Sequence, residues 1–371
     1  MGARPSGPTA LQRSLIHPAT YYAIRGALIA PGVIGLGPSI DAARRAGRAF
    51  GSARFNRKRV ERAMGHIEQA MPELDKPARH ELAIRSYEHL FELGVEMTSC
   101  ARTISEDAWP HHMRLGDIKP AIDVLLSGRP TILITGHCGN WEVLGFTIAL
   151  LGFSVQSIYR PLDVRPLDTW VRESRGRRGM MLLDKFGAMH QLPQIMREGR
   201  GAPAFVADQN AGDRALFVPY FGRLTSTYKS IGLLALEHDA TLIAGMARRL
   251  PKGSGEGSVR HPGALDYNIE IQGILEPQTY REAEDPMFFL TAWYRRAIEK
   301  MVLAAPEQYL WMHRMWKSRP RHERLNRAFP DPLREKLAAL PWNTDEDVAR
   351  IVDRSERDRA FLAEHGLNRM P

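Results

Sequence analysis

The feature that most constrains the fold is a series of short β-rich runs that begins near Pro130 and alternates with helical stretches. The runs span Thr131 to Thr135, Phe153 to Tyr159, Pro203 to Ala207 and Thr241 to Met246, and a further alternating run covers Tyr267 to Ile271. Short strands separated by helices are typical of βαβ units, whose strands form a largely parallel sheet. We therefore predict an α/β fold with a mostly parallel central sheet flanked by helices.

Helical patterns lie on both sides of this predicted sheet in the chain. The N-terminal region is helical in character, and apolar residues recur at helical spacing within Glu81–Met97. Asp285 followed by Pro286 has the pattern of an N-cap and a first helical position, which predicts a long helix through about Ala304. The predicted organisation is an N-terminal interfacial, membrane-anchoring segment at 1–55, a main domain at 56–325 and a small peripheral helical C-terminal appendage at 326–371.

The stretch from Gly26 to Ile40 carries no charged residue over fifteen positions. A spanning helix needs about 20 apolar residues, and Pro31 and Pro38 interrupt this stretch. We interpret it as an interfacial or re-entrant membrane anchor, and a buried N-terminal hairpin is an equal alternative.

The net charge of +9, from 51 basic and 42 acidic residues, favours anionic partners such as a phospholipid, a phosphorylated glycolipid or nucleic acid.

Ionisable residues follow four of the predicted strands at the point where each strand ends. They are His137, Arg160, Asp208 and the pair Arg248 and Arg249. In an open α/β sheet, ligands bind beyond the carboxyl ends of the strands. We therefore expect these side chains to converge in one crevice, although they are far apart in the chain.

His137 and Glu142 are five positions apart in the segment His-Cys-Gly-Asn-Trp-Glu. On one continuous helix this spacing would turn the two side chains about 140° apart. If Asn140 instead caps a helix that begins at Trp141, His137 lies in the turn and Glu142 in the first helical turn. The carboxylate can then accept the proton of one imidazole nitrogen and leave the other nitrogen free as a general base.

Two other kinds of site use the same residues and are less well supported. Cys138 is a possible nucleophile, but no separate histidine motif accompanies it. A metal site built from His137, Glu142 and Asp208 would lack the His-x-x-x-His or Cys-x-x-Cys spacing of such sites. Because Cys100 and Cys138 are the two cysteines of the chain, a disulfide framework is not expected. We predict no metal and no other cofactor.

Four blocks, in this order, resemble the lipid A biosynthesis acyltransferases, a family within the glycerolipid acyltransferase superfamily. GHCGNWE is similar to the family's His-x4-Asp/Glu motif, and SIYRPLD is similar to its Tyr-Arg-Pro block. ADQNAGDRALFVPYFG resembles the Asp-Gln block, with Thr227 at the family's threonine position, and EQYLWMHRMWKSRP resembles the C-terminal block. The resemblance covers about Asn56 to Arg321. It departs from the family at Tyr220, where the family has phenylalanine, in an insert around 253–263 and in the C-terminal appendage.

The resemblance implies an enzyme at the cytoplasmic face of the bacterial inner membrane. It would move a fatty acyl group from an acyl-carrier-protein thioester to a hydroxyl of a lipid A-type glycolipid. His137 would be the general base, oriented by Glu142, and Arg160 would stabilise the oxyanion or hold a phosphate. Asp208 would pair with Arg160 or with an acceptor hydroxyl. The predicted substrate-binding residues are Asn140, Arg160, Asp208, Gln209, Arg248 and Arg249.

Three other functions remain open from the sequence. An acyltransferase that uses acyl-CoA and a lysophospholipid or phosphatidylinositol mannoside would share the same chemistry. A non-catalytic lipid-binding protein of the membrane surface would not need an intact His137 and Glu142. A nucleic-acid binder is suggested by charge alone, without a helix-turn-helix or RNP-like pattern, so we expect a membrane surface and no nucleic acid as partner. Trp311, Trp316 and His313 fit an interfacial surface, and core packing of the tryptophans fits equally well.

Overall fold

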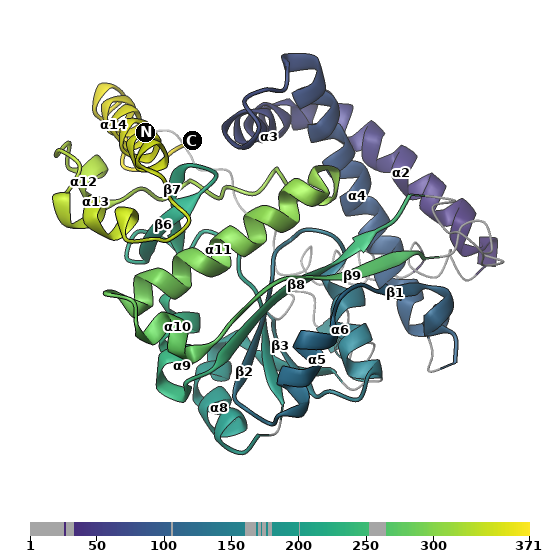
Figure 1. Ribbon diagram of the computed structural model, residues 1–371. Helices are drawn as coiled ribbons and strands as arrows, with labels where there is room; N and C mark the ends of the chain where they lie inside the picture. Colours follow the sequence, from purple (N-terminus) through teal and green to yellow (C-terminus); the bar gives the residue numbers. More distant parts are fainter. Residues whose placement is uncertain are drawn as a thin grey trace, which may run out of the picture.

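The computed structural model describes residues 33–104, 107–159, 180–199, 201–251 and 265–371, together with positions 26, 168, 169, 172 and 176. Arg160, the predicted loop at 252–263 and most of the N-terminal segment lie outside these residues. In the described part, a twisted sheet runs through the middle of the molecule with helices on both faces (Figure 1).

The central sheet has seven strands among the described residues, in the order β1-β9-β8-β2-β5-β3-β4. Neighbouring strands are parallel except β8 and β9, which are antiparallel. The prediction of a mostly parallel sheet is therefore confirmed. The strands are β1 (Met113–Leu115), β2 (Thr131–Thr135), β3 (Val155–Tyr159), β4 (Met180–Asp184), β5 (Ala202–Val206), β8 (Thr241–Arg249) and β9 (Tyr267–Leu275).

Strand β2 lies between β5 and β8, and all five of its residues are buried. Side chains alternate between the two faces of a strand. Ile132 and Ile134 accordingly belong to the large core that contains residues of α9 (Lys229–His238) and α11 (Pro286–Ala304). Leu133 belongs to a smaller core with Ala121 and Val124 of α5 (Lys119–Leu126). A strand that is buried on both faces usually has a continuous run of apolar residues, and β2 has such a run at Ile132–Ile134.

The helices cover both faces of the sheet and extend at its two ends (Figure 1). Asp285 caps α11, because its side chain accepts a hydrogen bond from the backbone N–H of Phe288 at 2.9 Å. The predicted helix from Pro286 to Ala304 is thereby confirmed. The longer helices are α2 (Leu36–Ser52), α3 (Arg57–Ala70), α4 (Lys76–Thr103), α5 (Lys119–Leu126), α6 (Trp141–Leu150), α8 (Lys185–Arg197), α9 (Lys229–His238), α11 (Pro286–Ala304), α13 (Asp331–Ala338) and α14 (Asp345–Glu364), and the shorter ones are α10 (Pro277–Arg281) and α12 (Arg321–Arg324).

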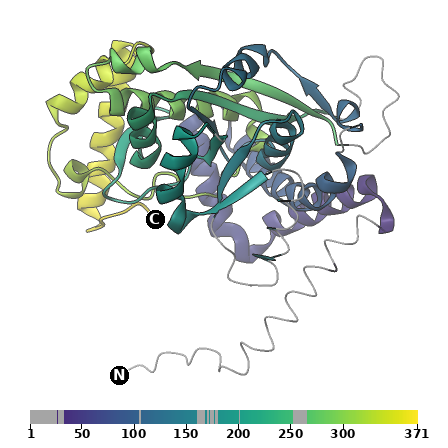
Figure 2. The same ribbon diagram turned by 90° about the horizontal axis from the view of Figure 1, so that it is seen from below.

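The N-terminal and C-terminal helices lie at opposite ends of the molecule, with α2 at one end and α13 and α14 at the other (Figures 1 and 2). At the C-terminal end, β6 (Leu216–Tyr220) and β7 (Arg223–Thr227) form a separate antiparallel hairpin. The buried Arg223 donates to both carboxylate oxygens of Asp358 in α14, at 2.7 and 2.9 Å. This pair joins the C-terminal helices to the hairpin.

At the N-terminal end, α2 packs against the long helix α4 (Figure 1). The uncharged stretch continues into α2, because Leu36 to Ile40 form its first turn. Among the described residues, we find no helix with both the length and the apolar character needed to cross a membrane. Val33 and Ile34, just before α2, have 79% and 55% of their surface exposed.

Candidate active site

His137 lies in the turn between β2 and α6, beyond the carboxyl end of β2. Its partner is Asp208, which follows the neighbouring strand β5. The imidazole Nδ1 lies 2.6 Å from Asp208 Oδ1, and the backbone N–H of His137 donates to Asp208 Oδ2 at 3.0 Å. The expected convergence of strand-end residues is thus observed for these two, because their strands are adjacent in the sheet.

The charge state of Asp208 decides which imidazole nitrogen carries the proton. Burial alone would raise the pKa of this carboxyl, but the charge and hydrogen bonds of His137 outweigh it and hold the pKa of Asp208 well below its usual value. An ionised carboxylate is only an acceptor, so the proton between the two groups sits on Nδ1. The Nε2 atom is therefore left as the basic nitrogen, and its neighbour is the side-chain nitrogen of Gln209 at 3.5 Å.

The turn that carries His137 is held by backbone hydrogen bonds from two other segments. Gly139 donates to the carbonyl of Gln308 at 2.9 Å, and Leu310 donates to the carbonyl of His137 at 3.2 Å. The next N–H, of Asn140, donates to the carbonyl of Ala247 at 2.8 Å. Gly139 has a φ of +58°, and a Cβ there would lie 2.2 Å from the Ala247 oxygen, so only glycine fits.

Asn140 caps α6 as predicted, since its Oδ1 accepts from the backbone N–H groups of Glu142 and Val143. Its Nδ2 donates to Glu96 and to Tyr267 at 3.0 and 3.1 Å, and the side chain is fully buried. Both ends of the amide thus bind protein groups. The expectation that Asn140 binds substrate is not supported, because its side chain binds protein groups that fix the turn between β2 and α6.

Glu142 is buried in the first turn of α6 and lines the same pocket as His137. The N-terminus of a helix favours a carboxylate at this position. The hydrogen-bond partner of the imidazole Nδ1, however, is Asp208. The expectation that Glu142 orients the imidazole is corrected accordingly. The predicted pairing of Asp208 with Arg160 lies outside the described residues.

Arg248 and Arg249 are the last two residues of β8, and they do not line the pocket that contains His137. Arg249 forms ion pairs with Glu92 and Glu96, both at 2.7 Å, and its side chain is only 15% exposed. Arg248 pairs with Glu270 on the adjacent strand β9. Both residues lie inside the β8–β9 ladder, where carboxylates of the protein neutralise them. These ion pairs give no support to a role in substrate binding, which stays a prediction for both residues.

Two aromatic contacts that the sequence analysis did not assign to the site enclose the imidazole. The ring of His313 stacks on that of His137, with centroids 4.9 Å apart and planes at 29°. The Trp141 ring meets it edge-on, at 5.0 Å and 71°. Burial, and then the charge of His137, lower the pKa of His313, which favours its neutral form. The tryptophans of this C-terminal block, Trp311 and Trp316, are buried in the core.

The described residues give little support to Cys138 as a nucleophile or to a metal site. Cys138 is fully buried, and burial together with the charge of Asp208 raises the pKa of its thiol far above the usual value. A thiol in this state is a poor nucleophile. No group of three or more His, Cys, Asp or Glu side chains in the described part of the chain is arranged to hold a metal ion.

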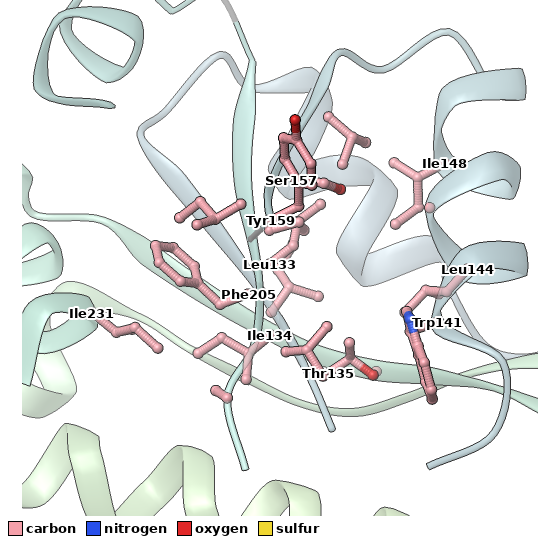
Figure 3. A pocket seen from close by; sticks show the side chains of 18 of the residues that line it. Leu133, Ile134, Thr135, Trp141, Leu144, Ile148, Ser157, Tyr159, Phe205 and Ile231 are labelled. Atoms are coloured by element: carbon pink, nitrogen blue, oxygen red, sulfur yellow. The ribbon is translucent and has the colours of Figure 1, made fainter. Parts of the chain in front are cut away.

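A pocket of about 500 Å³ opens beside His137 and extends along the sheet (Figure 3). His137, Glu142 and Gln209 line it together with a larger set of apolar side chains. Trp141, Leu144 and Ile148 of α6 face the strands, and Phe205 and Ile231 lie on the other side (Figure 3). Leu133, four residues before His137, also lines it.

Comparison with known proteins gives consistent matches. A family model described as bacterial lipid A biosynthesis acyltransferase matches residues 10–318. A lipid A biosynthesis lauroyltransferase of Escherichia coli (strain K12) is 26% identical over 278 residues, which cover 72% of this chain and 82% of the relative. A lipid A biosynthesis palmitoleoyltransferase of Escherichia coli (strain K12) and a lipid A biosynthesis acyltransferase of Shigella flexneri are each 25% identical over 199 residues, or 53% of this chain and 58% of each relative. The matched range of the family model contains the strands and turns that carry His137, Asp208 and His313.

Proposed function

This chain belongs to the bacterial lipid A biosynthesis acyltransferase family, and on that premise we propose that it transfers a fatty acyl group from an acyl-carrier-protein thioester to a hydroxyl of a lipid A-type glycolipid. We place this reaction at the cytoplasmic face of the bacterial inner membrane. The relatives named as lauroyltransferase and palmitoleoyltransferase support an acyl donor and a lipid A acceptor. The observation that carries the proposal is a basic imidazole nitrogen beside an apolar pocket.

His137 acts as the general base in the proposed reaction. Its Nε2 removes the proton of the acceptor hydroxyl while the hydroxyl oxygen forms a bond to the thioester carbonyl carbon. Asp208 keeps the proton on Nδ1 and stabilises the imidazolium that forms. When the tetrahedral intermediate collapses, the carbon–sulfur bond breaks, and the imidazolium returns the proton to the departing thiolate. A thiol with a pKa of about 8.5 is a far better leaving group than an alkoxide, so this step needs little further help.

The pocket beside His137 supports a fatty acyl chain as the transferred group. Its walls are mostly aliphatic and aromatic, and His137, Glu142 and Gln209 are among its polar residues. Pockets of a few hundred cubic ångströms with this composition are typical of sites for apolar ligands. An acyl chain that lies along the sheet in this pocket can place its carboxyl end, which carries the thioester, beside the imidazole of His137.

The membrane location is supported by the N-terminal end of the described chain. Val33 and Ile34 expose most of their apolar surface immediately before α2. Burying such side chains in the interfacial layer of a bilayer removes them from water. The excess of basic over acidic residues adds attraction to anionic lipid headgroups.

The proposal is tested by assaying the purified full chain with acyl-carrier-protein and CoA thioesters and with lipid A precursor, lysophospholipid or phosphatidylinositol mannoside as acceptors. Product is measured by mass spectrometry. We expect acylated lipid A precursor with the carrier-protein donor, and we expect His137→Ala to lower turnover by at least about 1,000-fold, as loss of a positioned base does. His365→Ala, an exposed histidine on the C-terminal end, is the matched control.

Glu142→Gln in the same assay tests the second catalytic residue that was predicted from the sequence. We expect at least a tenfold loss of turnover, because its carboxylate lines the pocket next to His137. Transfer to lysophospholipid or phosphatidylinositol mannoside alone would favour the related acyltransferase activity instead. Lipid binding without any transfer would favour a non-catalytic role.

A further inference from the structure

Arg295 is a fully buried arginine in the middle of α11. Its Nε donates to Thr227 Oγ1 at 3.0 Å, and its two terminal nitrogens donate to the carbonyls of Asp208 at 2.8 Å, Gln209 at 3.1 Å and Ser226 at 3.3 Å. The guanidinium carbon lies 5.1 Å from the centroid of the Tyr220 ring. These hydrogen-bond acceptors are all neutral, which is an unusual setting for a charge taken out of water.

Two of the carbonyls that Arg295 binds belong to Asp208 and Gln209, the residues whose side chains contact the two nitrogens of the catalytic imidazole. Asp208 contacts His137 through both carboxylate oxygens, and the next residue, Gln209, lies next to Nε2. Two consecutive carbonyls bound by one planar guanidinium have little freedom to turn. The bonds to Thr227 and Ser226 connect the same point to β7. Arg295 therefore links α11, the segment after β5 and the β6–β7 hairpin. This link lies at Asp208, the residue that holds the imidazole of His137.

We propose that Arg295 is a positioning residue of the acyl transfer, which acts through Asp208 and Gln209 to hold the imidazole of His137 in its reactive orientation. This inference rests on the proposed function, because it takes His137 as the base. A displacement of about 1 Å at a catalytic group costs on the order of 100-fold in rate. Loosening the Asp208 backbone is therefore expected to lower kcat without weakening the binding of either substrate.

The experiment compares Arg295→Lys with Arg319→Lys in the full chain. Arg319 is also fully buried, but it pairs with Glu323 and Asp358 and donates to the carbonyl of Leu224, so in the described part of the chain it binds neither Asp208 nor Gln209. Both substitutions keep the positive charge but remove the planar guanidinium group and several of its hydrogen bonds, so we expect both to lower the melting temperature. For Arg295→Lys we expect kcat to fall at least tenfold, with KM changed less than about twofold. We expect no such fall in kcat for Arg319→Lys. Thr227→Val, which removes one acceptor, is expected to give a smaller loss in the same direction and serves if Arg295→Lys does not fold.

A second measurement does not depend on turnover. In protein labelled with ¹⁵N-histidine, the Nδ1 proton bound between His137 and Asp208 is assigned by its loss in His137→Gln and followed by NMR. We expect this resonance to shift or broaden in Arg295→Lys and to stay unchanged in Arg319→Lys. An unchanged resonance with an unchanged kcat in folded Arg295→Lys, or an equal loss of kcat in Arg319→Lys, would overturn the inference. A wild-type chain without transfer to any acceptor would instead refute the proposed function, while the NMR comparison still tests the positioning.

Discussion

Replacing Asp208 with Asn is expected to remove nearly all activity, although the shape of the site is preserved. An amide presents an N–H group to Nδ1, so the imidazole is driven to the tautomer in which Nε2 carries the proton and is no longer a base. The same change in a Ser-His-Asp triad lowers kcat about 10⁴-fold, and we expect a loss of about 10³ to 10⁴. Asp213→Asn, at a partly exposed carboxylate that pairs with Arg369, is the control. A kcat within tenfold of wild type for Asp208→Asn would contradict the assigned pairing.

The position of the proposed base could be predicted from the sequence, but its hydrogen-bond partner could not. His137 follows an apolar strand directly, and that position alone indicates a residue in the crevice of an α/β sheet. Asp208 is 71 positions further along the chain, and it reaches His137 only because β5, rather than β3, is the neighbour of β2. Strand order of this kind depends on long-range packing. His313 gave still less signal, since it lies in a turn rather than at a strand end.

The elements that the sequence predicted best are those with a consistent local pattern. β2 is rich in β-branched residues, and its observed bounds match the predicted run. β4 was missed because Met-Met-Leu-Leu has neither alternation nor β-branched residues, and it forms a strand only by pairing with β3. The β6–β7 hairpin was missed because Pro219 breaks the strand pattern, and Phe221 and Gly222 reverse the chain with φ values of +50° and +66°.

The contact of α6 with the sheet is expected to limit the length of the acyl chain. Gly145 and Met180 both line the pocket, and a Cβ on Gly145 would lie 2.6 Å from the Met180 methyl carbon. Gly145→Leu should therefore fill part of the pocket. Each methylene that loses its burial costs about 0.8 kcal/mol, so the kcat/KM ratio of a long to a short acyl donor, four methylenes apart, is expected to fall at least tenfold. Gly65→Leu, on an open face of α3, should leave the ratio unchanged. Equal losses for both donors in Gly145→Leu would contradict this use of the pocket.

On the scale of the whole molecule, the C-terminal helices are joined to the main body by buried charges. Arg319 pairs with Glu323 and with Asp358 of α14, and Asp358 also pairs with Arg223 of β7. The sequence predicted a helical appendage from its composition but not this attachment, because Arg223 and Asp358 are 135 positions apart. The predicted division of the chain at 325 stays a prediction.

This attachment is expected to weaken in acid, and His322 is one cause. Its Nε2 hydrogen bonds to Ser355 of α14 at 2.9 Å, and burial, followed by the charge of Arg319, lowers its pKa from 6.5 to about 4. Between these values the unfolded chain binds a proton that the folded chain excludes, so stability falls as the pH drops from about 6.5 to 4. We expect the melting temperature to fall over this range, and to fall less in His322→Gln, which keeps a hydrogen-bonding group but does not titrate. His365→Gln, at an exposed site, should follow the wild-type curve. If His322→Gln followed it as well, the histidine would have no part in the acid sensitivity.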